Sequence, residues 1–73
     1  MLLSELKENQ SAVISFCNCE TDFGRRLCDM GFRSGERVVC VKRGLFKSPI
    51  IYLVCGSLTA LRKADADKIE VVL

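Results

Sequence analysis

Histidine is absent from the sequence, and with it the commonest general base and a common ligand of transition metals. No glycine-rich loop precedes a helix in the form that cradles phosphate, because Gly24 and Gly31 fit the start and the end of a single helix. The carboxylates are scattered over polar stretches, where we expect solvent to surround them. These absences argue against an enzyme.

Long apolar runs are also missing. No segment approaches the roughly 18–20 apolar residues that span a bilayer. The N-terminal MLLSELKENQ lacks the basic start and the apolar stretch of a secretory signal peptide. We therefore expect a cytoplasmic protein that is not itself in the membrane.

Neither sign of charge is in large excess. Lysine and arginine number 11 against 9 acidic residues, and the net charge of +2 is too small to indicate a nucleic-acid partner. Four phenylalanines and one tyrosine leave little aromatic surface for stacking on bases. Basic residues do concentrate in one region, where a solvated face is the simplest interpretation: Arg25, Arg26, Arg33, Arg37, Lys42 and Arg43.

The sequence does hold enough apolar material for one small core. The composition is 49% hydrophobic, which is normal for a globular chain. The length of 73 residues is close to the lower limit at which a single core is stable without disulfides or a bound metal. We expect residues 1–73 to form a single domain.

The stretch from Asp22 to Val41 predicts a helix, a turn and a strand. Asp22 is a suitable helix cap, because its carboxylate can accept from the free N–H groups of the first turn. Phe23, Leu27 and Met30 recur at a spacing that places them on one helix face. A helix this short needs a sheet to cover that face.

Glycines shape the chain beyond this helix. Gly31 suits the left-handed residue past a helix end, and Phe32 is then expected to fold back onto the apolar face. Gly35 allows a tight turn into a strand from Glu36 to Arg43. Apolar residues on both faces of this strand predict that it is central in the sheet or covered on both sides.

Alternating apolar residues predict further strands. The first is Ser11–Cys17, with Ala12, Ile14 and Phe16 inward. Two more are Ile50–Cys55, which follows Pro49, and Leu58–Arg62, which follows a Gly56-Ser57 turn. The last is residues 69–73, with Ile69, Val71 and Leu73 inward. Leu2–Leu6 is expected to be extended, and Ala64–Lys68 to form one helical turn. Five short strands in so small a chain indicate a mainly β fold, a partly open barrel with one helix between the first two strands, plugging one end.

The five cysteines do not resemble a disulfide scaffold. Their number is odd, their spacing is irregular and nothing indicates secretion, so we expect reduced thiols. Cys28, Cys40 and Cys55 are predicted to be packing residues.

Cys17 and Cys19 form the one unusual chemical pair. Two thiolates near a loop can bind a soft metal or form a redox-active disulfide. Cys28 would complete a three-thiolate cluster for Fe²⁺ or Zn²⁺. Cys-x-Cys is not the Cys-x-x-Cys pattern of zinc sites, so cysteines without a ligand are the alternative. We expect no tightly bound cofactor.

Leu45, Phe46 and Lys47 place two large apolar side chains in an expected loop. They would form a contact surface or fold back to cap the open end of the barrel.

Two motifs, in this order along the chain, resemble those of the FeoA family of small cytosolic accessory proteins of bacterial ferrous iron uptake. The first is Arg26-Leu27-Cys28-Asp29-Met30-Gly31-Phe32-x-x-Gly35, and the second is Pro49-Ile50 followed by Leu58-x-Ala60-Leu61-Arg62-Lys63-x-x-Ala66-x-x-Ile69-x-Val71. The likeness extends from about Leu3 to Leu73 and departs from the family pattern at Lys47-Ser48-Pro49.

This resemblance implies an SH3-like β-barrel with a helical insertion. It also implies a non-catalytic partner of FeoB, the membrane ferrous iron transporter, that modulates its assembly, nucleotide turnover or iron transport. We expect the partner surface to combine the outer helix face with the apolar loop: Arg25, Arg26, Asp29, Leu45, Phe46 and Lys47.

Three alternatives stay open. The chain would otherwise be a transition-metal-binding or iron-delivery protein, or an SH3-like regulatory module of the kind found in metal-dependent repressors. An exposed sheet edge would also allow a homodimer.

Overall fold

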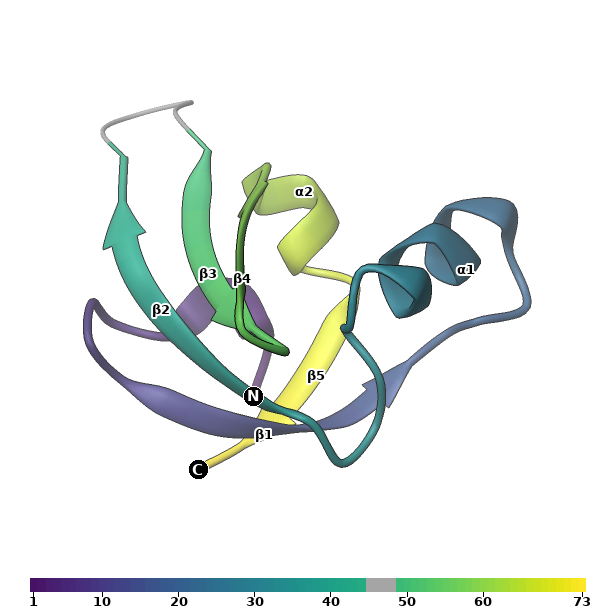
Figure 1. Cartoon of the computed structure of the whole chain (residues 1–73), viewed down its shortest axis with the longest axis horizontal. Helices are drawn as coiled ribbons and strands as arrows, with labels where there is room; N and C mark the ends of the chain where they lie inside the picture. The colour runs from purple at the N-terminus through teal and green to yellow at the C-terminus, as the bar shows by residue number, and fades with distance from the viewer. Residues whose placement is uncertain (45–48) are drawn as a thin grey trace.

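The computed structural model describes residues 1–44 and 49–73, and it confirms the mainly β fold (Figure 1). Five strands form one antiparallel sheet in the order β4-β3-β2-β1-β5: β1 Ser11–Cys17, β2 Arg37–Arg43, β3 Ile50–Val54, β4 Ser57–Leu61 and β5 Ile69–Val72. The main helix, α1 (Asp22–Asp29), lies between β1 and β2, and a one-turn helix, α2 (Lys63–Ala66), precedes β5. Because β4 and β5 end the strand order, the described part of the sheet is a partly open barrel.

The core lies on the inner face of this curved sheet. Its largest fully buried side chains include Tyr52 and Phe32, whose rings meet edge to face with centroids 6.3 Å apart. The Tyr52 hydroxyl donates to the Leu3 carbonyl at 3.1 Å, which satisfies the one polar group of this buried pair. Burial raises the pKa of the Tyr52 phenol, so it stays a protonated donor at neutral pH.

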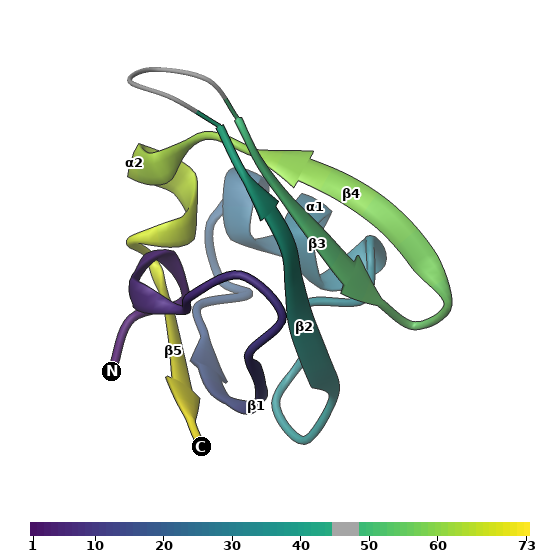
Figure 2. The same cartoon turned by 90° about the vertical axis from the view of Figure 1, so that its left-hand side faces the viewer.

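The N-terminal segment is a 3₁₀ helix, η1 (Leu3–Glu5), where an extended segment was expected. Leu3 and Leu6 are three residues apart, so one tight turn directs both into the core, and both are fully buried. The Arg43 guanidinium donates to the carbonyls of Ser4 and Leu6, at 2.7 Å each, and fastens this segment to β2. Figure 2 shows η1 next to α2, where the Ser4 hydroxyl donates to the Asp67 carboxylate.

Strand β1 has the predicted bounds, but the prediction for Phe16 is wrong. The pairing of β1 with β5 shifts register between Ile14 and Phe16. A bulge of this kind adds one residue and reverses the inward and outward alternation beyond it. Phe16 is therefore 50% exposed, and Cys17 faces the core in its place.

Outward-facing positions account for two more corrections. Strand β2 is central in the strand order, which confirms one of the two alternatives predicted for it. Cover on both sides is wrong, because Val41 in β2 is 38% exposed and the strand is covered on one face only. Leu73 lies beyond β5 and is 74% exposed, whereas Ile69 and Val71 are buried as predicted.

The turn between β3 and β4 is one residue earlier than predicted. It consists of Cys55 and Gly56, whose φ angles of 51° and 75° are those of a two-residue hairpin turn that follows the sheet twist. Cys55 is consequently exposed, which contradicts its assignment as a packing residue. Cys40 is fully buried, which confirms the same assignment for that residue.

Candidate functional site

The connection from β1 to α1 is built on hydrogen bonds from short polar side chains. Thr21 caps α1, because its hydroxyl accepts from the Gly24 N–H at 2.9 Å. Asp22, the predicted cap, is the first helical residue, where its carboxylate still faces the positive end of the helix dipole. The Asn18 side chain accepts from the Glu20 N–H at 3.0 Å and bends the connection before the helix.

Gly24 lets this connection pass directly over the first turn of α1. A Cβ at Gly24 would overlap the Asn18 carbonyl oxygen and lie 2.9 Å from the Thr21 hydroxyl. Only glycine accepts so close a backbone approach. The connection therefore runs back along the helix and brings its cysteines to α1.

Three sulfurs meet at this place. Cys19 and Cys28 form a disulfide with their Cα atoms 6.4 Å apart, and the Cys17 sulfur lies 3.9 Å from the Cys28 sulfur. All three Sγ atoms lie within 4.8 Å of one another, which confirms the predicted grouping. The prediction of a reduced Cys28 that serves only in packing is wrong, because Cys28 is buried and also bonded to Cys19. Burial raises the pKa of the Cys17 thiol, so it is protonated at neutral pH.

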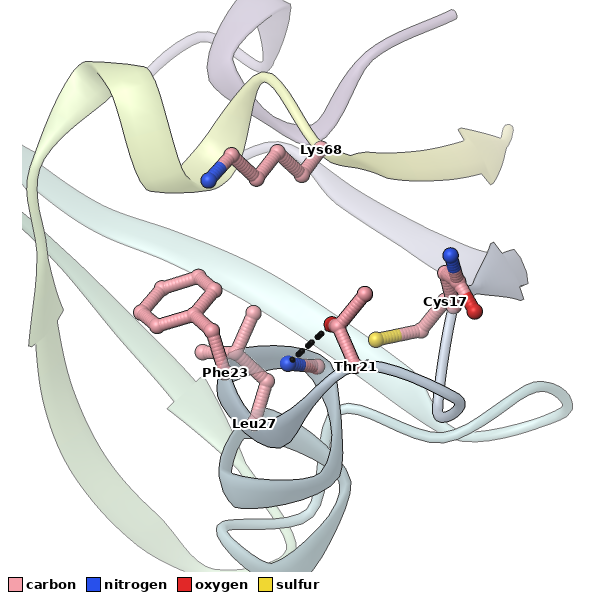
Figure 3. A pocket seen from close by; sticks show the side chains of 7 residues that line it. Cys17, Thr21, Phe23, Leu27 and Lys68 are labelled. Carbon is pink, nitrogen blue, oxygen red and sulfur yellow. Dashed lines mark hydrogen bonds between the residues drawn. The ribbon is translucent and has the colours of Figure 1, made fainter.

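A cavity of about 430 Å³ opens between α1 and the end of β1 (Figure 3). Cys17, Phe23 and Leu27 line it together with Lys68, whose ammonium nitrogen lies 4.7 Å from the centroid of the Phe23 ring. In Figure 3 the Cys17 sulfur is directed toward the helix, so the same thiol belongs to the cavity and to the sulfur cluster.

The far end of α1 confirms part of the predicted helix face. Leu27 is buried, Phe23 packs partly against the core, and Met30 is 36% exposed, which was not expected. The helix ends at Asp29, and Gly31 at φ 109° turns the chain so that the Phe32 N–H bonds the Leu27 carbonyl at 3.0 Å. Phe32 thus fills the core, and Met30 remains at the surface.

The expected partner residues of α1 are all at the surface. Arg25, Arg26 and Asp29 are exposed, and no ion pair within residues 1–44 and 49–73 involves them. Leu45, Phe46 and Lys47 lie outside the described residues. Arg43 does not add to a free basic face, because its guanidinium is engaged by η1 and Leu6.

Sequence reasoning missed an apolar row on the outer face of the sheet. Val39, Leu53 and Leu58 lie opposite one another on β2, β3 and β4. Leu53 is 38% exposed and Leu58 67% exposed. Their signal in the sequence was apolar residues at outward positions on either side of a two-residue turn.

A family model described as the FeoA domain matches residues 1–73, the whole of the sequence. The chain belongs to the FeoA domain family. The predicted family and the predicted SH3-like barrel are thereby confirmed. A zinc complex of FeoA from Stenotrophomonas maltophilia, described as an SH3 domain protein, is 33% identical with a TM-score of 0.84, covering 97% of this chain and 88% of that one.

Other relatives of this FeoA-family chain extend the comparison. The iron(II) transport protein A of Clostridium thermocellum is 32% identical with a TM-score of 0.92, covering all of this chain and 45% of that one. The Fe(2+) transport protein A/Fe(2+) transporter FeoB fusion protein of Porphyromonas gingivalis is 36% identical over all 73 residues. The chain spans only 9% of that fusion protein.

A manganese-dependent transcriptional repressor shares the fold, with a TM-score of 0.85 at 16% identity. That likeness extends to the fold alone. Within residues 1–44 and 49–73, no helix has the length and apolar character needed to cross a membrane.

Proposed function

We propose that this FeoA-family chain is a non-catalytic accessory protein of ferrous iron uptake that binds a FeoB-type transporter on its cytoplasmic side. The observation that supports this is the fusion relative, in which a segment 36% identical to the whole chain is joined to FeoB in one polypeptide. Covalent linkage holds two parts at high effective concentration. Where no such linkage exists, a binding surface has to hold the same partner.

The proposed surface is the outer face of α1. Arg25 and Arg26 offer two planar guanidinium groups with no ion-pair partner among the described residues, and Asp29 adds one acidic group a turn further on. Arginine is enriched at protein interfaces because it forms bidentate bonds with carboxylates. The Thr21 cap, the tight approach at Gly24 and the Cys19–Cys28 disulfide hold this helix in place, so little order has to be gained on binding.

Binding of this kind alters a transporter by favouring one of its states. A chain with higher affinity for one conformation shifts the equilibrium by that difference in affinity. The effect would be seen in the transporter's assembly, nucleotide turnover or iron transport. Chemistry by the chain itself is not needed.

Co-purification tests the proposal. Tagged chain is recovered with membranes from its own organism grown without oxygen and short of iron, and the retained proteins are identified by mass spectrometry. We expect a FeoB-type transporter among them. Its absence from the retained proteins, with the transporter present in the starting membranes, would contradict the proposal.

Charge reversal locates the surface. Arg25→Glu with Arg26→Glu should abolish retention of the transporter, while Lys7→Glu with Arg62→Glu, an equal change of net charge at exposed residues elsewhere, should preserve it. Leu58→Lys tests the apolar row of the sheet separately. Loss of retention with Leu58→Lys alone would move the interface from α1 to the sheet.

A further inference from the structure

The three sulfurs of Cys17, Cys19 and Cys28 have the geometry of a ligand set. A metal bound tetrahedrally by sulfur at about 2.3 Å holds its ligands about 3.8 Å apart. The Cys17 and Cys28 sulfurs are already 3.9 Å apart. Within the cluster, the disulfide partner Cys19 is the ligand that would have to move.

Cys19 has the freedom for that movement. Its side chain is exposed in the connection between β1 and α1, whereas Cys17 and Cys28 are buried against the core. Two sulfurs that bind one metal lie about 2 Å further apart than two sulfurs joined in a disulfide, so the Cys19 sulfur has to move away from the Cys28 sulfur by about that distance. A change of side-chain rotamer at an exposed residue can supply that distance.

We propose that Cys17, Cys19 and Cys28 form a redox-gated site for a soft divalent cation, closed by the Cys19–Cys28 disulfide and opened by its reduction. With the disulfide formed, Cys17 is the only thiol of the cluster, and one thiolate does not hold a metal firmly. With the disulfide reduced, three thiolates converge on one point, and a fourth position is left for solvent.

The chemistry balances in two steps. A dithiol reductant of the thioredoxin class gives two electrons and two protons to the Cys19–Cys28 disulfide, which becomes two thiols while the reductant becomes a disulfide. The cation then displaces three protons to solvent and forms three metal–sulfur bonds, leaving a complex of net charge −1. Lys68 lines the same cavity as Cys17, so its ammonium group places a positive charge in the cavity beside this anionic complex.

Thiolate ligands define the class of cation. Sulfur ligands favour Zn²⁺ over Mg²⁺ or Mn²⁺, and Fe²⁺ binds a given site more weakly than Co²⁺ or Zn²⁺. Among Zn²⁺, Co²⁺ and Fe²⁺, we therefore expect Zn²⁺ to bind most tightly and Fe²⁺ most weakly. Co²⁺ serves as the spectroscopic probe. This inference does not depend on the proposed function, because it concerns the isolated chain.

Cobalt titration of the full chain in its two redox states tests the site. The oxidised chain should contain three free thiols, Cys17, Cys40 and Cys55, and the reduced chain five. Reduced chain, handled without oxygen and freed of reductant, should bind one Co²⁺ with a thiolate charge-transfer band. The oxidised chain should show no such band and bind at least about 100-fold more weakly.

Single substitutions identify the ligands. In the reduced chain, Cys19→Ser should weaken Co²⁺ binding at least about tenfold, and because Cys19 is exposed the variant should keep the fold, as circular dichroism would verify. Cys55→Ser is the matched control, since Cys55 is also exposed but lies in the β3–β4 turn. Equal Co²⁺ affinity of the reduced and oxidised chains, or an equal loss with Cys55→Ser, would overturn the proposal.

Discussion

Gly24 shows how one missing side chain shapes the candidate site. Alanine is normally the better helix former by up to about 1 kcal/mol. Here its Cβ would overlap the Asn18 carbonyl, so Gly24→Ala should lower the free energy of unfolding by about 1–3 kcal/mol. Urea denaturation measures this, with Arg25→Ala on the exposed helix face as a control expected to change little. A Gly24→Ala chain as stable as the parent would show that the connection can move away from the helix.

Arg43 stabilises the fold by hydrogen bonds, although its charge suggested that it belongs to a solvated basic face. Arg43→Met leaves the carbonyls of Ser4 and Leu6 without their donor and should cost about 1–3 kcal/mol in the free energy of unfolding. Lys42→Met, at the exposed neighbour in β2, should change it by no more than about 0.5 kcal/mol. Equal effects of the two substitutions in urea denaturation would contradict this role.

Asp67 should make stability depend on acid pH. The hydrogen bond from Ser4, and then the interaction with Lys63, lower the pKa of the Asp67 carboxyl from its ordinary 3.8. A lowered folded-state pKa gives stability that is complete above the unfolded value and is lost as pH falls through the folded value. The free energy of unfolding should therefore decline below about pH 4.

The comparison of two variants isolates this contribution. Asp67→Asn should flatten the decline. Glu20→Gln should preserve it, because the exposed Glu20 carboxylate makes no hydrogen bond or ion pair in the described part of the chain. Urea denaturation repeated between about pH 2 and pH 6 gives the two profiles. Parallel profiles for parent and Asp67→Asn would exclude Asp67 as the cause.

At the scale of elements, the Cys19–Cys28 disulfide ties the β1–α1 connection to the last turn of α1. It closes a loop between residues nine positions apart, and cross-linking a loop of this length restricts the unfolded chain by about 2–3 kcal/mol. Adding a dithiol reductant should lower the melting temperature, and Cys19→Ser should lower it equally without reductant. If reductant lowers the melting temperature of Cys19→Ser as much as that of the parent, the stabilising bond is not this one.

Local patterns predicted most elements because their causes are local. The alternation in Ser11–Cys17 gave the bounds of β1, and the positive φ angles of Gly31 and Gly35 are where turn chemistry placed them. Phe16 was misplaced because the bulge depends on the pairing of β1 with β5, in which Cys17 lies opposite Ile69, 52 positions further along the chain.

The site was only partly predictable for a similar reason. The cluster of three cysteines was anticipated from their nearness in sequence to one helix. The disulfide was not, because it depends on the connection running back over Gly24, and a spacing of nine residues does not reveal that path. Tertiary contacts of this kind leave no periodic signal in a single sequence.

As a whole molecule, the chain is a small barrel in which, over the described residues, every buried side-chain nitrogen and oxygen atom has a hydrogen-bond partner. The N-terminal segment covers the outer edge of β5 through the Leu2–Glu70 bridge, which leaves β4 as the end strand without a partner among the described residues. A homodimer through β4 is therefore the assembly that the sheet would allow. Sedimentation of the purified chain distinguishes it from a monomer.

The central claim is that the chain acts by binding a FeoB-type transporter through α1. The most direct test is to titrate the purified chain onto the detergent-solubilised FeoB-type transporter of its own organism and to measure equilibrium binding. We predict saturable binding that Arg25→Glu with Arg26→Glu weakens at least about tenfold, while Lys7→Glu with Arg62→Glu leaves it unchanged. Absence of saturable binding by the parent chain would contradict the claim.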